Sequence, residues 1–339
     1  MKTDIFDYDL PPEYIAQTPI EPRHNSRLLV FNRTSEQIEQ GIFKNIRDWL
    51  DDGDLLVLNK TKVIPARIYG KKETGGKAEV LLLKKIDDLR WEALVGGKNL
   101  TPGKSIIFDD GIKGQIIQNL GRSERLLQFS KPIESLMRER GEMPLPPYIH
   151  TQLEDQSRYQ TVFAQEEGSA AAPTAGLHFT HTLIEQLKAN GIEFAEITLH
   201  VGLDTFAPVT EDDVEDHLIH TEWCQMGAEA ADRINYAKQN GHRVIAVGTT
   251  SVRTLETADR YRGTDGMLRE FACPTDLFIT PGYRYKVVDA MVTNFHLPRS
   301  TLLMLVSAFA GLENIKNCYQ YAMRAGFRFY SFGDAMLIL

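Results

Sequence analysis

The chain has 339 residues, of which 42% are hydrophobic and 25% are charged, and this balance excludes a disordered or fibrous protein. Its formal net charge of −8 argues against general nucleic-acid binding, because a phosphate backbone favours a basic surface. The longest apolar run, near residues 302–310, is too short to span a bilayer, which takes about 20 residues. The acidic N-terminus lacks the apolar stretch of a signal peptide, so we expect a soluble, cytoplasmic protein without membrane association.

The cysteines point to the same compartment. Cys224, Cys273 and Cys318 are odd in number and show no close pairing in the sequence. We therefore expect neither a disulfide scaffold nor a cysteine-based zinc site, and we expect a reducing environment.

The first 62 residues contain two apolar runs typical of strands, residues 26–32 (SRLLVFN) and 54–59 (DLLVLN). Residues 63–149 have a different character. Six short apolar or alternating runs, at 63–70, 77–85, 90–96, 105–108, 114–118 and 125–130, are separated by turn signals with no helical pattern between them. This pattern predicts a small all-β barrel or sandwich, and we assign it to an inserted β-barrel domain.

Basic residues gather in part of this region. Between residues 59 and 85 they are Lys60, Lys62, Arg67, Lys71, Lys72, Lys77, Lys84 and Lys85, against two acids, Glu73 and Glu79. A solvated face of a small sheet explains such a run, and so does a local tRNA footprint on an otherwise acidic protein.

From residue 150 to 339 the chain alternates between helix and strand. Residues 181–202 and 229–258 each have a helical pattern, a glycine stop and an apolar strand. In the first, Thr182 and Glu185 have the spacing of a capping box, and Asn190-Gly191 ends the helix. This alternation predicts an α/β fold with parallel strands. We group residues 1–62 and 150–339 into one discontinuous, barrel-like α/β main domain.

Three loops that lead into helices carry candidate binding groups. Residues 168–180 (GSAAAPTAGLHFT) contain Gly176, His178 and Thr180, with small residues that let backbone approach a ligand. Residues 197–208 (ITLHVGLDTFAP) predict a buried strand that ends in a glycine-containing loop, and His200, Gly202 and Thr205 would lie at its carboxyl end, where ligands collect in α/β sheets. Gly248, Thr249, Thr250 and Arg253 open a predicted helix whose free N–H groups suit a carboxylate or phosphate. In each case an ordinary helix entry or N-cap is the competing interpretation.

The most polar loop precedes a strongly apolar helix near the C-terminus. Asn294, His296, Arg299, Ser300 and Thr301 crowd this loop, which is more typical of a site than of a turn. Asp334 lies in the closing segment 327–339 (FRFYSFGDAMLIL), whose aromatic residues are typical of a core. A further set, His217, His220 and Glu222, has a spacing that zinc ligands can have, although it is not the HExxH signature and a solvated helix explains it as well. We expect no metal.

Several of these segments together resemble a known family. The chain is similar to the S-adenosylmethionine:tRNA ribosyltransferase-isomerases of queuosine biosynthesis over residues 6–339, and the segments GLHFT, TNFHLPRST and SFGDAM are the most specific. Three positions depart from the usual pattern of the family: Asp204 replaces a glycine, Lys60 follows Asn59 where Asp or Asn is common, and Cys273 replaces a frequent glycine.

The resemblance implies a fold and a reaction. It implies an α/β barrel-like domain with an inserted β-barrel, in agreement with the patterns above. It also implies transfer and isomerisation of the ribosyl group of S-adenosylmethionine onto the 7-aminomethyl-7-deazaguanine base at the tRNA wobble position. The products would be epoxyqueuosine-tRNA, adenine and methionine, with S-adenosylmethionine as cosubstrate, no bound cofactor and a monomeric enzyme.

This chemistry assigns roles to the candidate residues. A base must remove a proton from the ribose 5′ carbon beside the sulfonium, and imidazole suits this step. We favour His178 as the base and give His296 an orienting role, because Arg299 is close to His296 in sequence and a cation lowers imidazole basicity. Asp334 is a candidate partner of the leaving adenine, and Arg253 of the methionine carboxylate. A zinc hydrolase and a non-catalytic tRNA-binding protein are the alternatives from other function classes.

Overall fold

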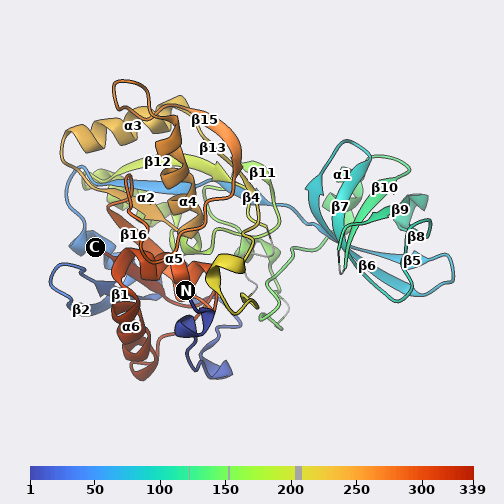
Figure 1. The fold of residues 1–339 in the computed structure, drawn as a ribbon, viewed down its shortest axis with the longest axis horizontal. Helices are drawn as coiled ribbons and strands as arrows, with labels where there is room; N and C mark the ends of the chain where they lie inside the picture. The colour runs from blue at the N-terminus through green and yellow to red at the C-terminus, as the bar shows by residue number, and fades with distance from the viewer. Residues whose placement is uncertain (122, 152, 203–207) are drawn as a thin grey trace. The chain divides into compact units, whose positions relative to one another are not determined.

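The computed structural model describes residues 1–121, 123–151, 153–202 and 208–339. These residues form two compact units, and the chain contributes more than one segment to each. The first unit contains Met1–Lys62, Pro147–Glu166 and Ala172–Leu339, and the second contains Val63–Pro146 and Glu167–Ala171. In Figure 1 the strands of the second unit are coloured cyan and green.

A nine-stranded mixed sheet organises the first unit (Figure 1). Its strands, in spatial order, are β15 (Phe271–Thr275), β13 (Glu222–Met226), β12 (Glu193–Leu199), β3 (Leu55–Asn59), β14 (Val244–Val247), β16 (Ala290–Asn294), β17 (Ala335–Ile338), β1 (Arg27–Phe31) and β2 (Ile38–Ile42). The neighbours β12, β3, β14 and β16 run parallel to one another. Their carboxyl ends therefore meet at one edge of the sheet, where α/β proteins bind ligands.

Helices connect these strands and confirm the predicted α/β class. In the first unit they are α2 (His181–Ala189), α3 (Ala228–Gln239), α4 (Thr249–Ala258), α5 (Thr301–Ala310) and α6 (Leu312–Arg324). The predicted start of α2 was wrong. The hydroxyl of Thr180, rather than that of Thr182, caps the helix by accepting a hydrogen bond from Leu183 N, whereas the predicted stop at Gly191, with φ of +79°, is confirmed. A capping hydroxyl must precede the first helical residue, and Thr182 already lies inside the first turn.

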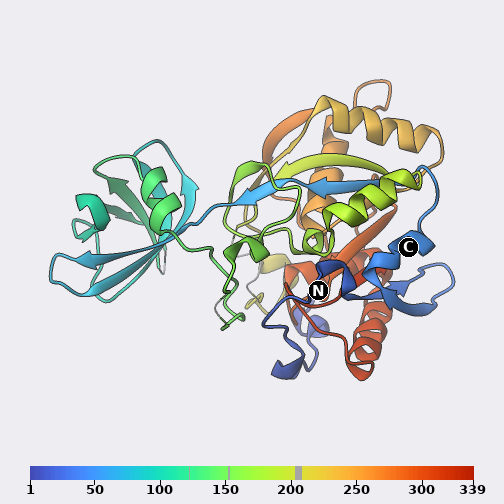
Figure 2. The same ribbon diagram turned by 180° about the vertical axis from the view of Figure 1, so that it is seen from behind.

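Burial on both faces explains why the central strands are so apolar. All five residues of β3 are buried. Its even-numbered positions, Leu56 and Leu58, join a core with Leu183, Ile184 and Leu187 of α2, which Figure 2 shows in front of the sheet. On the opposite face, α4 packs against β3, β12 and β14. Continuous apolar runs are the sequence signature of strands covered in this way.

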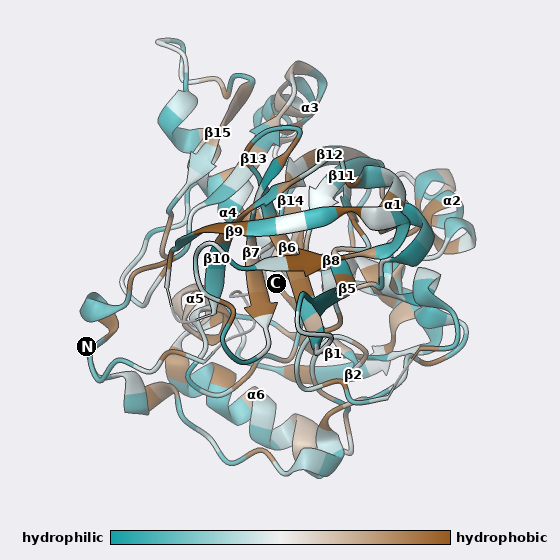
Figure 3. Ribbon diagram, turned by 90° about the vertical axis from the view of Figure 1, so that its right-hand side faces the viewer, coloured by the Kyte–Doolittle hydropathy of each residue, from teal (hydrophilic) through white to brown (hydrophobic). Residues whose placement is uncertain are grey.

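Helix α6 lies at the surface and is amphipathic, as its alternating hydrophilic and hydrophobic bands in Figure 3 show. Its buried residues, Ile315, Cys318, Tyr319 and Ala322, recur at spacings of three and four. Helix α5, by contrast, is buried over most of its length, and Ser300 caps it by accepting a hydrogen bond from Leu303 N at 3.1 Å.

The second unit contains a closed six-stranded barrel, which confirms the predicted β-barrel. Its strands are β5 (Arg67–Lys72), β6 (Lys77–Lys85), β7 (Arg90–Gly96), β8 (Ser105–Ile107), β9 (Lys113–Asn119) and β10 (Glu124–Phe129), and a short helix, α1 (Glu134–Arg140), follows. Buried and exposed positions alternate along β7, as expected for a barrel with a filled interior. Strands β4 (Thr61–Val63) and β11 (Glu166–Ser169) form a separate two-stranded sheet.

The structure brings together two cysteines that the sequence leaves apart. Cys224 and Cys273 lie directly opposite each other on the neighbouring strands β13 and β15. Their thiols are free, as is that of Cys318. In the part of the chain that the structure describes, no helix is both long and apolar enough to cross a membrane.

Candidate active site

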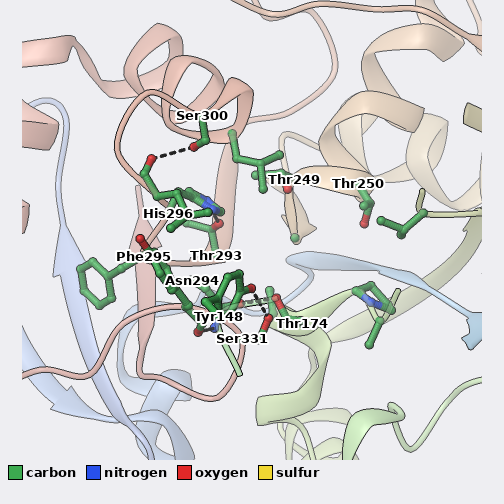
Figure 4. A pocket seen from close by; sticks show the side chains of 18 residues that line it. Tyr148, Thr174, Thr249, Thr250, Thr293, Asn294, Phe295, His296, Ser300 and Ser331 are labelled. Atoms are coloured by element: carbon green, nitrogen blue, oxygen red, sulfur yellow. Dashed lines mark hydrogen bonds between the residues drawn. The ribbon is translucent and has the colours of Figure 1, made fainter. Parts of the chain in front are cut away.

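A cavity lies at the carboxyl ends of β14 and β16, within the first unit. It encloses about 570 Å³ of space, part of which is open to solvent. Four segments supply most of its wall, and the full lining consists of residues 172–175, 248–250, 293–297 and 330–331, with Tyr148, Val201, Ser300 and Leu302. Figure 4 shows these side chains converging from separate elements. Concave sites lined by apolar side chains and a few convergent polar groups are typical of small-molecule sites.

The turn from β14 into α4 forms one wall. Gly248 adopts φ of +91°, and its N–H donates to Val292 O at 2.8 Å, which ties the turn to β16. A residue with a side chain is strained at this φ, so glycine is favoured here. Thr249 and Thr250 follow at the cavity surface, and Thr250 Oγ1 accepts a hydrogen bond from Asn59 Nδ2 at 3.2 Å. Its hydroxyl proton remains available to a ligand oxygen.

His296 forms the facing wall and is 8% exposed. Its ring nitrogen Nε2 lies 2.8 Å from Thr293 Oγ1, whereas Nδ1 has no partner within the described residues. Both backbone polar groups of His296 are held by tyrosines: its N–H donates to the hydroxyl of Tyr319, and its carbonyl oxygen accepts from the hydroxyl of Tyr8. Burial lowers the pKa of His296 to about 3, so the imidazole is neutral at pH 7.

His178 lies behind this wall rather than in it. It is fully buried and is not among the residues that line the cavity. The hydrogen bonds of Asn294 determine which ring nitrogen of His178 carries the proton. The Asn294 amide donates to Tyr330 O and to His178 Nε2, at 3.1 and 3.2 Å, while its oxygen accepts from Thr174 Oγ1. Nε2 of His178 is therefore an acceptor, and Nδ1–H donates to Ser26 Oγ at 2.7 Å.

Both ring nitrogens of His178 are thus occupied. Burial, with smaller contributions from the cations Arg23 and Arg328, holds its pKa well below the usual range. The ring also packs on Phe43, with centroids 5.1 Å apart. This geometry suits a residue that positions Asn294 at the cavity better than one that takes a proton from a ligand.

Two other predicted residues of the same loop have structural roles. A Cβ atom on Gly176 would lie 2.7 Å from Phe163 Cζ, so close packing requires glycine there. Thr180 caps α2 and lies 2.7 Å from Nδ1 of His24. Neither residue lines the cavity.

The predicted site residues that follow β12 also form hydrogen bonds within the protein. His200 Nδ1 lies 2.8 Å from Thr61 Oγ1, and Gly202 N–H donates to Glu222 Oε1 at 2.8 Å. Neither lines the cavity, and Thr205 lies outside the described residues.

Arg253 also lies away from the cavity, and its guanidinium is committed. Nη1 forms a buried ion pair with Glu222, in which the two side chains are 7% and 4% exposed. Nε donates to Leu277 O at 3.1 Å and Nη2 to Thr275 O at 3.3 Å. These bonds leave Arg253 without a free donor pair for a carboxylate, in contrast to the role that the sequence suggested.

Asp334 holds the C-terminal loop and does not line the cavity. Its carboxylate accepts backbone N–H bonds from Arg27 and Arg328, at 2.9 and 2.8 Å. It fixes the turn that carries Ser331 into the cavity wall.

Sequence reasoning missed the aromatic side of the cavity. The Tyr148 hydroxyl lies 2.7 Å from Ser331 Oγ, and its ring packs on Tyr330 with centroids 4.7 Å apart. No local pattern marks Tyr148, because it lies next to Ser331 only in the folded chain.

Comparison with known proteins decides the family. The family model described as "Queuosine biosynthesis protein" matches residues 3–338. The chain belongs to this family.

Curated relatives match from end to end. The chain is 54% identical to the S-adenosylmethionine:tRNA ribosyltransferase-isomerase of Symbiobacterium thermophilum and 50% identical to that of Staphylococcus haemolyticus, with 100% of each chain covered in both comparisons. It also resembles the crystal structure of S-adenosylmethionine tRNA ribosyltransferase from Thermotoga maritima, with a TM-score of 0.58, 40% identity, and 99% and 100% of the two chains covered. The relatives carry the names of enzymes, and this chain, as a member of the same family, is an enzyme as well.

Of the three positions that depart from the family pattern, the structure describes Lys60 and Cys273, and neither lines the cavity. Lys60 follows β3, with Nζ 3.6 Å from Glu166, and Cys273 lies on the edge strand β15. Asp204 lies outside the described residues.

The alternative zinc site has no support in the geometry. Among the described residues, no group of three histidine, cysteine or carboxylate side chains converges as metal ligands would. His217 pairs with Glu211 at 3.0 Å, and Glu222 with Arg253.

Proposed function

We propose that the chain transfers and isomerises the ribosyl group of S-adenosylmethionine onto the 7-aminomethyl-7-deazaguanine base at the wobble position of tRNA. The products are epoxyqueuosine-tRNA, adenine and methionine. The full-length family match supports the reaction class, and the cavity between α4 and the loop after β16 supports this place for the cosubstrate. We also propose that the enzyme is monomeric and cytoplasmic, where its free thiols would remain reduced.

Within this proposal, His296 is the base. The sulfonium acidifies the ribose 5′ carbon, and a neutral imidazole facing the cavity can take the proton. When Nε2–H donates to Thr293, Nδ1 presents its lone pair to the cavity. The imidazolium that forms lies beside the negative carbon of the ylide, which offsets the cost of a buried charge.

The other cavity residues bind and orient. The hydroxyls of Thr249 and Thr250, at the start of α4, are placed for ribose oxygens. Asn294 presents an amide whose orientation is fixed by three hydrogen bonds. His178 positions Asn294, and Asp334 positions the loop of Ser331. The apolar part of the wall would shield the attacking amine of the tRNA base from water once the substrates are bound, which keeps that amine poorly solvated and reactive.

Isotope transfer tests the reaction. With tRNA that carries the aminomethyl base, label in the ribose of S-adenosylmethionine should enter the RNA, and label in the methyl group should not. Methyl incorporation would make the protein a methyltransferase and reject the proposal. tRNA binding without turnover of S-adenosylmethionine would instead indicate a non-catalytic binding protein, and loss of turnover with a chelator would indicate a metal hydrolase.

A further inference from the structure

Arg23 is a buried cation with unused donors. The residue is 7% exposed, and its Nε donates to Leu177 O at 3.1 Å. Nη1 and Nη2 are also buried, and neither has a hydrogen-bond partner among the described residues. Buried polar groups in native proteins are nearly always paired, so two orphaned nitrogens of one guanidinium require an explanation.

The surroundings of Arg23 carry an excess of positive charge. The nearby charged groups are Arg328 and Asp334, and His178 is neutral. Asp334 already accepts two backbone hydrogen bonds, and its carboxylate lies 3.8 Å from Nη2 of Arg328. Burial, and then the charge of Arg328, lower the pKa of Arg23 to about 9, while Asp334 opposes this shift only in part. Two cations, of which Arg23 is buried and Arg328 is partly exposed, therefore lie near a single carboxylate, and this excess of positive charge favours binding of an anion.

Arg23 does not line the cavity, but it contacts two segments that supply residues to its wall. It bonds to Leu177, in the 3-10 turn Thr174–His178 whose first residue lines the cavity. Its guanidinium carbon lies 5.9 Å from the centre of the Phe332 ring, next in sequence to the cavity residue Ser331. Asn294, between these segments, bonds to His178 and also lines the cavity.

We propose that Arg23 binds the carboxylate of the methionyl part of S-adenosylmethionine, in a bound state in which its two Nη atoms, closed off from the cavity in this structure, become accessible to it. This inference rests on the proposed function. The methionyl carboxylate is the anionic group of that cosubstrate, and the two Nη atoms of a guanidinium match the spacing of two carboxylate oxygens. Arg253, the arginine that the sequence suggested for this role, has its donors occupied by Glu222 and backbone carbonyls.

Decarboxylated S-adenosylmethionine tests this assignment by calorimetry without tRNA, because it keeps the adenosine, sulfonium and amine. The wild-type protein should bind S-adenosylmethionine about 10- to 100-fold more tightly than this analogue, as expected for a charge-assisted pair. Arg23→Met should weaken binding of S-adenosylmethionine by a similar factor and leave binding of the analogue unchanged. Arg23→Lys should keep part of the preference.

Arg33→Met is the matched control. Arg33 is a half-buried arginine of the same unit, but its three nitrogens donate to the carbonyls of Leu339, Phe309 and Asp289. This variant should keep the preference for the carboxylate. Arg23→Met should also unfold at the same urea concentration as the wild type or a higher one, because it removes a buried charge that no protein acceptor pairs.

The outcomes separate this inference from the function on which it rests. Equal binding of both ligands by the wild type would overturn the carboxylate subsite and leave the proposed function intact. Binding of neither would count against the proposed function itself. If Arg23→Met kept the preference but weakened tRNA binding with a smaller salt dependence, Arg23 would bind a phosphate, and the carboxylate assignment would be wrong. An equal loss for both ligands would reduce Arg23 to a structural role.

Discussion

The side-chain amide of Asn294 donates a hydrogen bond to Nε2 of His178 over 3.2 Å, and a second bond to Tyr330 O fixes the direction of that amide. The hydrogen bond between Asn294 and His178 distinguishes the states of His178 and His296, the histidines of the two family motifs. His178 has both ring nitrogens engaged inside the protein, whereas His296 lines the cavity and its Nδ1 has no hydrogen-bond partner among the described residues.

The first prediction concerns these two histidines. His296→Gln should lower kcat by about 10²–10⁴, the usual cost of losing a general base, with little change in the Kd of S-adenosylmethionine. If the wild type exchanges the ribose 5′ proton with solvent, this variant should not. His178→Gln should keep that exchange and act mainly through weaker substrate binding. Lost exchange in His178→Gln, with normal exchange in His296→Gln, would return the base to His178.

The second prediction concerns stability in acid. Because burial lowers the pKa of His296 to about 3 from about 6.5 in the unfolded chain, the unfolded state binds more protons between these values. The stability associated with the neutral ring is complete above about pH 6.5 and is lost as the pH falls toward 3. At pH 5 the loss from His296 is about 2 kcal/mol, and the lowered pKa of His178 adds to it. Urea unfolding of His296→Gln should therefore show a weaker pH dependence between pH 7 and 5. A slope equal to that of the wild type would contradict the neutral, buried state of His296.

The third prediction concerns the ion pair of Arg253 and Glu222. Arg253→Met leaves a buried carboxylate without its cation and should destabilise the protein by about 3–5 kcal/mol, measured by urea unfolding. The double variant Arg253→Met/Glu222→Leu should recover much of this loss, since it removes both charges. It should also keep the preference for S-adenosylmethionine over its decarboxylated analogue. Loss of that preference in a stable double variant would place the carboxylate at Arg253.

The fourth prediction concerns tRNA. Lys71 and Lys77 are directly opposite each other on β5 and β6, both are exposed, and the exposed Tyr69 is two positions from Lys71 on the same strand. Like charges in this position destabilise a sheet, so an anionic partner would relieve their repulsion. Lys71→Ala/Lys77→Ala should weaken tRNA binding and reduce its log–log salt slope by about 0.7–0.9 for each lost phosphate contact. Fluorescence anisotropy at several salt concentrations measures both quantities.

Lys85→Ala is the control for this experiment, because Lys85 is already paired with Glu134 and Asp88. It should leave the slope unchanged. Equal slopes for the double variant and the wild type would mean that the basic run, at least at Lys71 and Lys77, is a solvated face.

Local sequence was sufficient for much of the architecture. The alternation of helix and apolar strand predicts the α/β unit because helix caps, glycine stops and strands buried on both faces act over a few residues. The six short runs between residues 63 and 130 predict the β-barrel for the same reason, and Ser300 is recognisable as a cap from its place before an apolar helix. The error at Thr182 is also local: two threonine hydroxyls two positions apart compete for the role of helix cap, and only the backbone conformation of Thr180 decides between them.

The sequence by itself determined the family, the fold class and a short list of polar groups, since these follow from motifs and short-range patterns. Only the tertiary structure decided which of those groups face the cavity. His178 and His296 lie in similar loops, yet Asn294 and Ser26 occupy both ring nitrogens of His178, whereas Nδ1 of His296 has no partner in the part of the chain that the structure describes. In the sequence, Arg253 stands at the start of a helix and is a candidate for anion binding, but in the folded chain it pairs with Glu222 of β13. No sequence motif marks Arg23. Protonation and availability depend on burial and on partners far along the chain, and those contacts exist only once the chain has folded.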